Sequence, residues 1–245
     1  MATFSRANFN SPLFRDFRPN YTPALYDLIY RFHAGHGGKF LDVVDVGTGT
    51  GLVAEALSEK FDKMLSNAVQ KPNIDYQEAS AERLPFADSR VDVITSGQAF
   101  HWFDHPKFFG EAKRILKPRG TLAIFGYSVS IIKDNKEATD IFYEYATGLI
   151  GKVHWYFSHE GHDTTNLGSV SQNQFMEHQI TLDWFETFAK TWSTYANYRE
   201  KHPEAEGPAE RMIRRLSKAI GVKDRDTETF AVQWPTVLVV AENDK

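Results

Sequence analysis

The chain has 245 residues, of which 42% are hydrophobic and 24% charged, and these values are typical of a globular protein with one large domain or a core and an appended region. The absence of cysteine excludes disulfides, thiolate nucleophiles and cysteine-ligated metals. The net charge of −4 argues against a nucleic-acid partner, which requires a clustered basic surface. No apolar run reaches the ~20 residues of a membrane span, and residues 1–10 lack a secretory signal, so we expect a cytoplasmic protein without a membrane partner.

The first predicted elements form a helix followed by a strand, a turn and a second helix. Residues 23–30 begin with proline and carry apolar groups at helical spacing, and the glycine-rich residues 34–38 end that helix. The near-continuous apolar run 40–46 predicts a buried strand. The glycine-rich turn 47–51 and a helix over residues 52–61 follow it.

Strands and helices continue to alternate along the next part of the chain. Strands are predicted over residues 74–79, 91–96 and 121–127, with a helix over residues 107–116 and a closing strand over residues 237–241. This alternation predicts an α/β fold with a Rossmann-like, doubly wound and mostly parallel sheet.

The pattern changes after Tyr127, because residues 136–225 are rich in aromatic groups at helical spacing. We expect a mostly helical region there, with residues 181–198 forming one helix. An insertion late in an open α/β sheet commonly lies over the carboxyl ends of the strands, where ligands bind. The expected parts are an N-terminal arm and helix (1–38), a Rossmann-like core (39–130 and 226–245) and a helical substrate cap (131–225).

Residues 45–51 form the motif with the clearest chemistry, an acid followed by glycines at alternate positions. Glycine permits turns that side chains block, and it lets the backbone approach a ligand closely. A dinucleotide-binding turn has the spacing Gly-x-Gly-x-x-Gly, so an NAD-dependent oxidoreductase is an alternative that this spacing disfavours. A non-catalytic protein that retains a cofactor site is a second alternative.

The turn with its preceding acid resembles motif I of the class I S-adenosylmethionine-dependent methyltransferases. The resemblance implies that S-adenosylmethionine is the cofactor and S-adenosylhomocysteine the product, with Asp45 supporting the amino group of the cofactor. Residues 79–86 resemble the family's D-A-E-x-L-P-F segment, which borders the adenine, although Ser80 replaces the usual aspartate. The implied cofactor-binding residues are Tyr21, Asp45, Gly47, Thr48, Gly49, Gly51, Ser80, Ala81, Glu82, Ser96 and Gln98.

Four further segments resemble a fungal branch that includes trans-aconitate and cantharidin methyltransferases. They are residues 18–21 (R-P-x-Y), 97–104 (containing A-x-H-W-F-D), 124–127 and 191–195 (T-W-S-x-Y). Within this branch, the chain is similar to enzymes that S-methylate a dithiol such as reduced gliotoxin. The resemblance implies methylation of a thiol, or of a carboxylate or hydroxyl oxygen, on a small molecule of secondary metabolism such as a reduced epidithiodiketopiperazine. A carboxylate O-methyltransferase acting on a trans-aconitate-like substrate is the alternative.

The sequence departs from the family pattern after the first glycine-turn helix. The family has a second strand there, ending in an acid that binds the ribose hydroxyls, whereas residues 59–62 run directly into residues 63–68. Loss of an inner strand would expose its neighbours' edges. We therefore expect that residues are missing between Asp62 and Lys63, with a second gap near residues 158–163, and the ribose-binding acid cannot be named.

His101 is the candidate catalytic base, because an imidazole titrates near neutral pH, and a structural histidine at the end of the sheet is the alternative. We find no metal site. Arg15 and Arg18 are candidates for binding an anionic substrate, or they are surface charges. The oligomeric state stays open, and for Trp192 packing in the core of the cap is the alternative. The candidate substrate-binding residues are Arg15, Arg18, His101, Trp102, Trp155, Tyr156 and Trp192, with His154 nearby.

Overall fold

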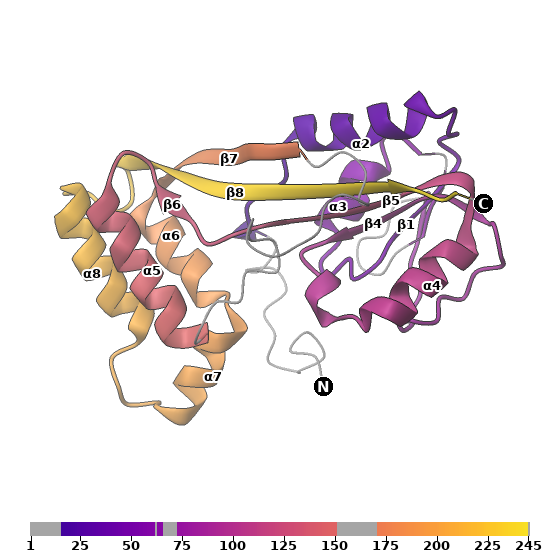
Figure 1. Ribbon diagram of the computed structural model, residues 1–245. Coiled ribbons are helices and arrows are strands. Elements are labelled where there is room, and N and C mark those ends of the chain that lie inside the picture. The colour runs from indigo at the N-terminus through magenta and orange to yellow at the C-terminus, as the bar shows by residue number, and fades with distance from the viewer. Residues whose placement is uncertain (1–15, 62, 66–72, 151–170, 245) are drawn as a thin grey trace. The chain divides into compact units, whose positions relative to one another are not determined.

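The fold is known from a computed structural model, whose chain separates into two units (Figure 1). The described residues are 16–61, 63–65, 73–150 and 171–244. The core unit contains the described parts of 20–127, 171–174 and 236–244, and the helical unit contains those of 16–19, 128–150 and 175–235.

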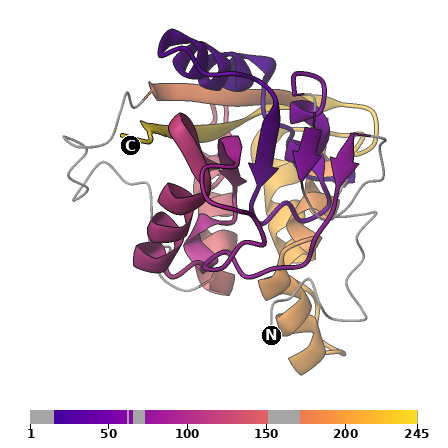
Figure 2. The same cartoon turned by 90° about the vertical axis from the view of Figure 1, so that its right-hand side faces the viewer.

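Five parallel strands form most of the sheet of the core unit, several of which are seen side by side in Figure 2. Their order across the sheet is β3-β2-β1-β4-β5, which confirms the predicted α/β fold with a mostly parallel sheet. The strands are β1 (Asp42–Asp45), β2 (Lys63–Leu65), β3 (Ile74–Asp75), β4 (Val91–Gly97) and β5 (Leu116–Tyr127).

The order of the strands reverses between β1 and β4. The chain passes from β1 outward to β2 and β3, and then returns to place β4 on the other side of β1. In open α/β sheets, ligands bind at the carboxyl ends of the strands beside such a reversal. The strand that follows β5 in the sheet is β8 (Thr229–Glu242), which pairs antiparallel to it from Thr121–Glu242 to Tyr127–Thr236.

Helices cover both faces of the core sheet because successive strand residues point to opposite sides. Val43 packs in the cluster that contains α2 (Pro23–Gly35) and α3 (Leu52–Leu57). Its neighbour Val44 packs in the cluster that contains α4 (His105–Ile115). Figure 1 shows α2 and α4 on opposite faces of the sheet. Packing on both faces therefore holds the strands, and so the residues at their carboxyl ends, in place.

The prediction that the chain has no room for a second strand is wrong. β2 forms at Lys63–Leu65 and pairs with both neighbours, with Asp42 opposite Lys63 and Met64 opposite Ile74. The α-helix α3 ends at Leu57 rather than at the expected residue 61, which frees residues for the return to the sheet. Three residues at about 3.3 Å each suffice for this short strand. Asp62, at the first suggested gap, lies outside the described residues. The second suggested gap, residues 158–163, lies outside the described residues.

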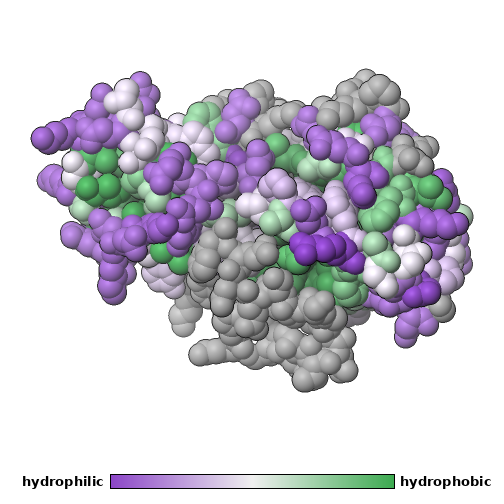
Figure 3. Space-filling model, turned by 90° about the horizontal axis from the view of Figure 1, so that it is seen from above, coloured by the Kyte–Doolittle hydropathy of each residue, from purple (hydrophilic) through white to green (hydrophobic). Residues whose placement is uncertain are grey.

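The helical unit contains most of the remaining elements. The ring centroids of Phe142 and Phe185 lie 4.7 Å apart, which packs the first two of its helices together. In the space-filling view, mostly hydrophilic side chains cover the left end, where Figure 1 places α5 and α8 (Figure 3). The elements are β6 (Ile131–Ile132), α5 (Lys136–Ile150), β7 (Ser171–Thr181), α6 (Leu182–Lys190), α7 (Ser193–Lys201) and α8 (Pro208–Ile220).

Two details of the predicted helical region are wrong. Residues 181–198 form two helices rather than one, because Trp192 adopts an extended conformation with φ −72° and ψ 135°. Thr181 instead caps α6 by accepting a hydrogen bond from the amide of Trp184. In addition, β7 is a strand that pairs with β8, and its polar residues hide the alternation that buries Met176 and Ile180.

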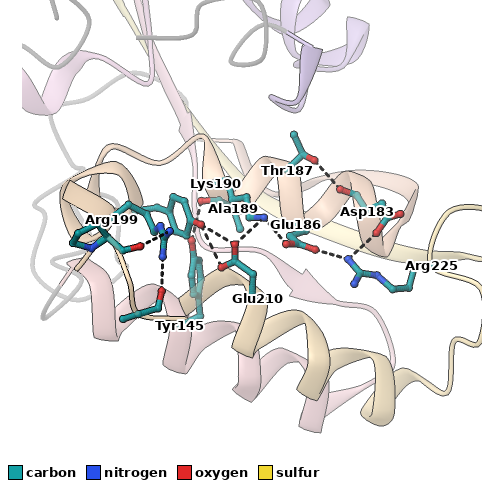
Figure 4. Close-up of polar contacts among 12 residues, drawn as sticks. Tyr145, Asp183, Glu186, Thr187, Ala189, Lys190, Arg199, Glu210 and Arg225 are labelled. Carbon is teal, nitrogen blue, oxygen red and sulfur yellow. Dashed lines mark hydrogen bonds and ion pairs between the residues drawn. The ribbon is translucent and has the colours of Figure 1, made fainter. Parts of the chain in front are cut away.

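Charged side chains join the last helices of the helical unit (Figure 4). Glu210 of α8 accepts a hydrogen bond from the Tyr195 hydroxyl at 2.9 Å and pairs with Lys190 Nζ at 2.9 Å. Arg225 pairs with Asp183 at 2.7 Å and also with Glu186. Both partners of each of these contacts belong to the helical unit, which indicates a structural role. No helix in the described part of the chain is long and apolar enough to cross a membrane.

Candidate functional site

Asp45 ends β1 at the point where the strand order reverses, and its side chain is buried, with the residue 5% exposed. The Thr95 hydroxyl on β4 donates a hydrogen bond to its Oδ1 at 2.7 Å. Its other oxygen, Oδ2, is buried and has no hydrogen-bond partner among the described residues. Burial raises the pKa of Asp45 to about 6, while the hydrogen bond from Thr95 opposes the shift. A buried carboxyl with one unsatisfied oxygen is suited to a cationic hydrogen-bond donor.

The glycine turn after Asp45 depends on backbone conformations that disfavour side chains. Gly47 has φ +78°, and a Cβ there would lie 2.4 Å from the Cβ of Ala99. Gly49 has φ +56°, but a Cβ there would meet no described atom within 4 Å. Gly47 is therefore needed for packing inside the protein, whereas the side of Gly49 lies open. Thr48 lies between them, and Gly51 caps α3 with φ +89°.

Three further predicted residues lie at the carboxyl ends of β4 and β5. Ser96 is fully buried, and its Oγ has no hydrogen-bond partner within the described ranges. Gln98 donates from Nε2 to the carbonyl oxygen of Tyr127 at 2.7 Å, which joins the two strand ends. Tyr21 packs edge-to-face against Phe125 with the ring centroids 4.7 Å apart. The strand ends thus bring together residues far apart in the sequence.

The predicted adenine-side residues lie in the loop between β3 and β4. Ala81 packs against the cluster that contains Val46, directly after β1. The Ser80 hydroxyl donates to the carboxylate of Glu82. The backbone amide of Asp104 also donates to Glu82, with its nitrogen 2.9 Å from Oε1. The Glu82 carboxylate is therefore already engaged by the protein at both oxygens.

His101 and Trp102 lie in the short 3-10 helix η2 (Phe100–Trp102), which follows β4. Trp102 is 68% exposed, and its ring centroid lies 4.9 Å from that of His101. Although His101 also reaches solvent, partial desolvation lowers the pKa of its imidazole. The ring is therefore mostly neutral at pH 7, which is the form that accepts a proton.

The helical unit contains Arg18 and Trp192. The Arg18 guanidinium carbon lies 5.7 Å from the centroid of the Phe188 ring. Trp192 contacts the rings of Phe142 and Tyr145 at 5.8 and 5.7 Å, as expected for packing in an aromatic core. Its indole N–H is nevertheless buried without a hydrogen-bond partner in the described part of the chain. The other predicted residues, Arg15, His154, Trp155 and Tyr156, lie outside the described residues.

Sequence reasoning missed Thr95, which donates a hydrogen bond to Asp45, and Ala99, which packs against Gly47. Thr95 is opposite Asp45 in the register of β1 and β4, and only this register reveals the pairing. Ala99 occupies the space against Gly47. Across residues 16–61, 63–65, 73–150 and 171–244, acidic and histidine side chains form no group of three suited to a metal ion.

Comparison with known proteins identifies a recognised domain that contains Asp45 and the glycine turn. Residues 44–124 match a family model described as a methyltransferase domain. A Dictyostelium discoideum protein named as a methyltransferase is 26% identical over 96% of this chain and 93% of its own length. A Saccharomyces cerevisiae protein named as an S-adenosylmethionine-dependent methyltransferase is 23% identical, with 96% of each chain covered.

The fold also matches a solved structure. The structure described as a type II methyltransferase from Anaeromyxobacter dehalogenans has a TM-score of 0.69 and 23% identity, with 92% of this chain and 98% of the other covered. Its similarity supports the Rossmann-like fold. Together, the matched domain, the two relatives and the glycine turn after Asp45 support a class I S-adenosylmethionine-dependent methyltransferase.

Proposed function

We propose that the enzyme methylates a sulfur or oxygen atom of a small molecule, with a thiol as the preferred acceptor. The cofactor supplies a methyl group already activated on a sulfonium, so the protein must chiefly bind, align and exclude water. The observation that carries the proposal is the unsatisfied Oδ2 of Asp45, which precedes a turn whose Gly49 has open space on one side. An ionised carboxylate there fits the ammonium group of the cofactor.

The remaining cofactor contacts are assigned by their position at the same strand ends. Ser96 offers a buried hydroxyl that has no partner in the described structure, and Gly49 offers backbone that a ligand can approach. Tyr21 contributes an aromatic face, which favours a cationic sulfonium. The other proposed contacts are those of Gly47, Thr48, Gly51, Ser80, Ala81, Glu82 and Gln98.

We propose that the atom that accepts the methyl group belongs to an ionisable group, such as a thiol. His101 is the proposed base, and its lowered pKa leaves it largely neutral and able to accept a proton from a thiol at pH 7. A thiolate or carboxylate that is already ionised requires no base. These properties suit a dithiol of secondary metabolism such as a reduced epidithiodiketopiperazine, as the resemblance to the fungal branch implies, in a cytoplasmic enzyme.

The helical unit is proposed to supply the substrate cap. Within it, the indole N–H of Trp192 lacks a partner among the described residues. We propose that it donates a hydrogen bond to the substrate that receives the methyl group. The cap is proposed to span residues 131–225, and the core residues 39–130 and 226–245. A second candidate, O-methylation of a trans-aconitate-like carboxylate, is favoured by Arg18, whose guanidinium can pair with an anion.

The test is to incubate the purified protein with S-adenosylmethionine and, separately, a reduced dithiol or trans-aconitate, and to follow methylated products by mass spectrometry. Methylation of the dithiol and its loss in His101→Gln would support the preferred function. Methylation of trans-aconitate alone, with a raised KM in Arg18→Gln, would favour the second. Tight binding of S-adenosylhomocysteine without product from either would contradict both acceptors.

A further inference from the structure

Glu82 joins two segments that lie on opposite sides of β4 in the sequence. One is its own loop, in which the Ser80 hydroxyl donates to the Glu82 carboxylate and the Glu82 amide lies 3.3 Å from that hydroxyl. The other is the turn that carries His101, where the Asp104 amide donates to Glu82 Oε1 at 2.9 Å. The carboxylate is thus a bridge between the loop and the turn.

The bridge holds the turn at its last amide. The turn begins at Gln98, whose amide donates to Phe125 of β5 at 3.0 Å. It closes on itself where the amides of Trp102 and Phe103 donate to the carbonyl groups of Ala99 and Phe100. Asp104 then caps α4 through its side chain. The sheet fixes the start of the turn, and Glu82 fixes its end.

A second glutamate holds the same loop without contacting the turn. Glu111 of α4 accepts from the Leu84 amide at 2.6 Å and pairs with Arg114 at 2.7 Å. Arg114 also donates to the Leu84 carbonyl oxygen at 3.1 Å. Glu82 and Glu111 therefore perform the same chemistry on one loop. They differ in that the described contacts of Glu82 reach the turn of His101.

We propose that Glu82 is a positioning residue, which sets the orientation of His101 by tying its turn to the loop predicted to border the adenine. This inference rests on the proposed function, because it assumes that His101 acts on the acceptor. Carboxylate hydrogen bonds to backbone amides are charge-assisted, so they hold geometry more firmly than neutral ones. A ligand that orders the loop would also order the turn.

The test compares Glu82→Ala with the matched control Glu111→Ala. In Glu82→Ala we expect kcat to fall about fivefold, the loss corresponding to one hydrogen bond of ordinary net strength. The imidazole resonance of His101, assigned with His101→Gln, is expected to titrate closer to the ordinary histidine pKa because the released turn is more hydrated. In Glu111→Ala both values should stay as in the wild type.

Two conservative variants sharpen the comparison. Glu82→Gln keeps an oxygen that can accept from the Asp104 amide, so it should restore most of kcat and the wild-type titration. Glu82→Asp is too short to reach that amide and should behave as Glu82→Ala, which covers the case in which the alanine variant does not fold.

The histidine titration separates this inference from the proposed function. A wild type without methylated product, together with a shifted titration in Glu82→Ala, would contradict the proposed acceptors but support the positioning. An unchanged titration in folded Glu82→Ala and Glu82→Asp would overturn the positioning, whatever the activity. Equal shifts in the Glu82 and Glu111 variants would overturn it as well, because they would show a general loosening of the loop.

Discussion

The two ends of the core sheet differ in whether their buried polar groups have hydrogen-bond partners. At the amino ends of the strands, Asp92 Oδ2 accepts from the Asp42 amide at 2.9 Å and pairs with Lys117 Nζ at 2.9 Å. Arg90 forms an ion pair with Asp42. At the carboxyl ends, Asp45 Oδ2 has no partner among the described residues. The described polar groups at one end are therefore paired within the protein, whereas the other end leaves a carboxylate oxygen without a partner among the described residues.

A histidine chain shows the same pairing at the amino ends. His33 is 1% exposed, and its Nε2 lies 2.8 Å from the Lys39 carbonyl oxygen. Because a carbonyl only accepts, Nε2 carries the proton, and Nδ1 accepts from the Thr121 hydroxyl at 2.9 Å. That hydroxyl oxygen in turn lies 3.2 Å from His36 Nε2.

The contrast indicates that the polar groups at the amino ends stabilise the fold, whereas those at the carboxyl ends are available for binding. Buried polar groups that are fully paired hold a fold together, and unpaired ones cost free energy unless a ligand compensates them. Substitutions at the amino ends should therefore change stability without changing cofactor affinity. Substitutions of the unpaired polar groups at the carboxyl ends should do the reverse.

Asp92→Ala should produce the largest loss of stability. It removes one partner of a buried ion pair and the acceptor of the Asp42 amide, so we expect the free energy of unfolding to fall by about 3 kcal/mol. Chemical denaturation measures this value, and calorimetric titration with S-adenosylhomocysteine should give the wild-type affinity for the folded fraction. A weakened affinity with unchanged stability would contradict this contrast between the two ends.

Alanine substitutions at Gly47 and Gly49 should have the next largest effects on stability, and the two effects should differ. Gly47→Ala adds strain at positive φ and a clash with Ala99, so the free energy of unfolding should fall by about 2 kcal/mol. Gly49→Ala meets no described atom and should cost about 1 kcal/mol from strain alone. If a ligand lies over Gly49, however, this milder variant should still lose affinity for S-adenosylhomocysteine. Wild-type affinity in Gly49→Ala would show that no ligand approaches there.

His33→Gln should have the smallest effect, visible as a change in pH dependence. Burial lowers the pKa of His33, and Lys117 and His36 add to this, while Asp92 and the Lys39 carbonyl oppose it. Its contribution to stability is therefore present above the ordinary pKa of about 6.5 and is lost as the pH falls below that value. The stability difference between wild type and variant, measured from pH 5 to 8, should shrink on acidification. A difference independent of pH would contradict the lowered pKa of His33.

The sequence was sufficient to predict the α/β class and the position of Asp45 between a buried strand and a glycine turn, because both follow from local signals. A buried strand, glycines at alternate positions and a following helix are contiguous in the chain. The sequence also placed Ser96 correctly at a strand end, since the apolar run of β4 stops there.

Other features depended on contacts that no local pattern encodes. Thr95 is a partner of Asp45 through strand register, and Glu82 meets Asp104 across 22 residues. The strand β2 was missed because a three-residue strand has too few positions to show periodicity. The break before α7 was missed because Trp192 continues an aromatic helical pattern while its backbone turns away.

The pH dependence of Asp45 connects binding and stability. Its pKa is raised from 3.8 to about 6, so its contribution to the stability of the unliganded protein is present below pH 4 and is lost as the pH rises through 6. Binding of an ammonium group requires the ionised form. Cofactor affinity should therefore rise over the same pH range in which this contribution to stability falls.

The most direct test of this account is a calorimetric titration of S-adenosylhomocysteine into wild type and Asp45→Asn at pH 5 and pH 7.5. The wild type should bind about tenfold more tightly at pH 7.5, because one proton must leave a carboxyl of pKa near 6. Asp45→Asn keeps an acceptor for Thr95 but lacks the charge, so it should bind at least tenfold more weakly than wild type at pH 7.5, with no such pH dependence. Equal affinities of the two proteins at pH 7.5 would contradict the assignment of the cofactor site to Asp45.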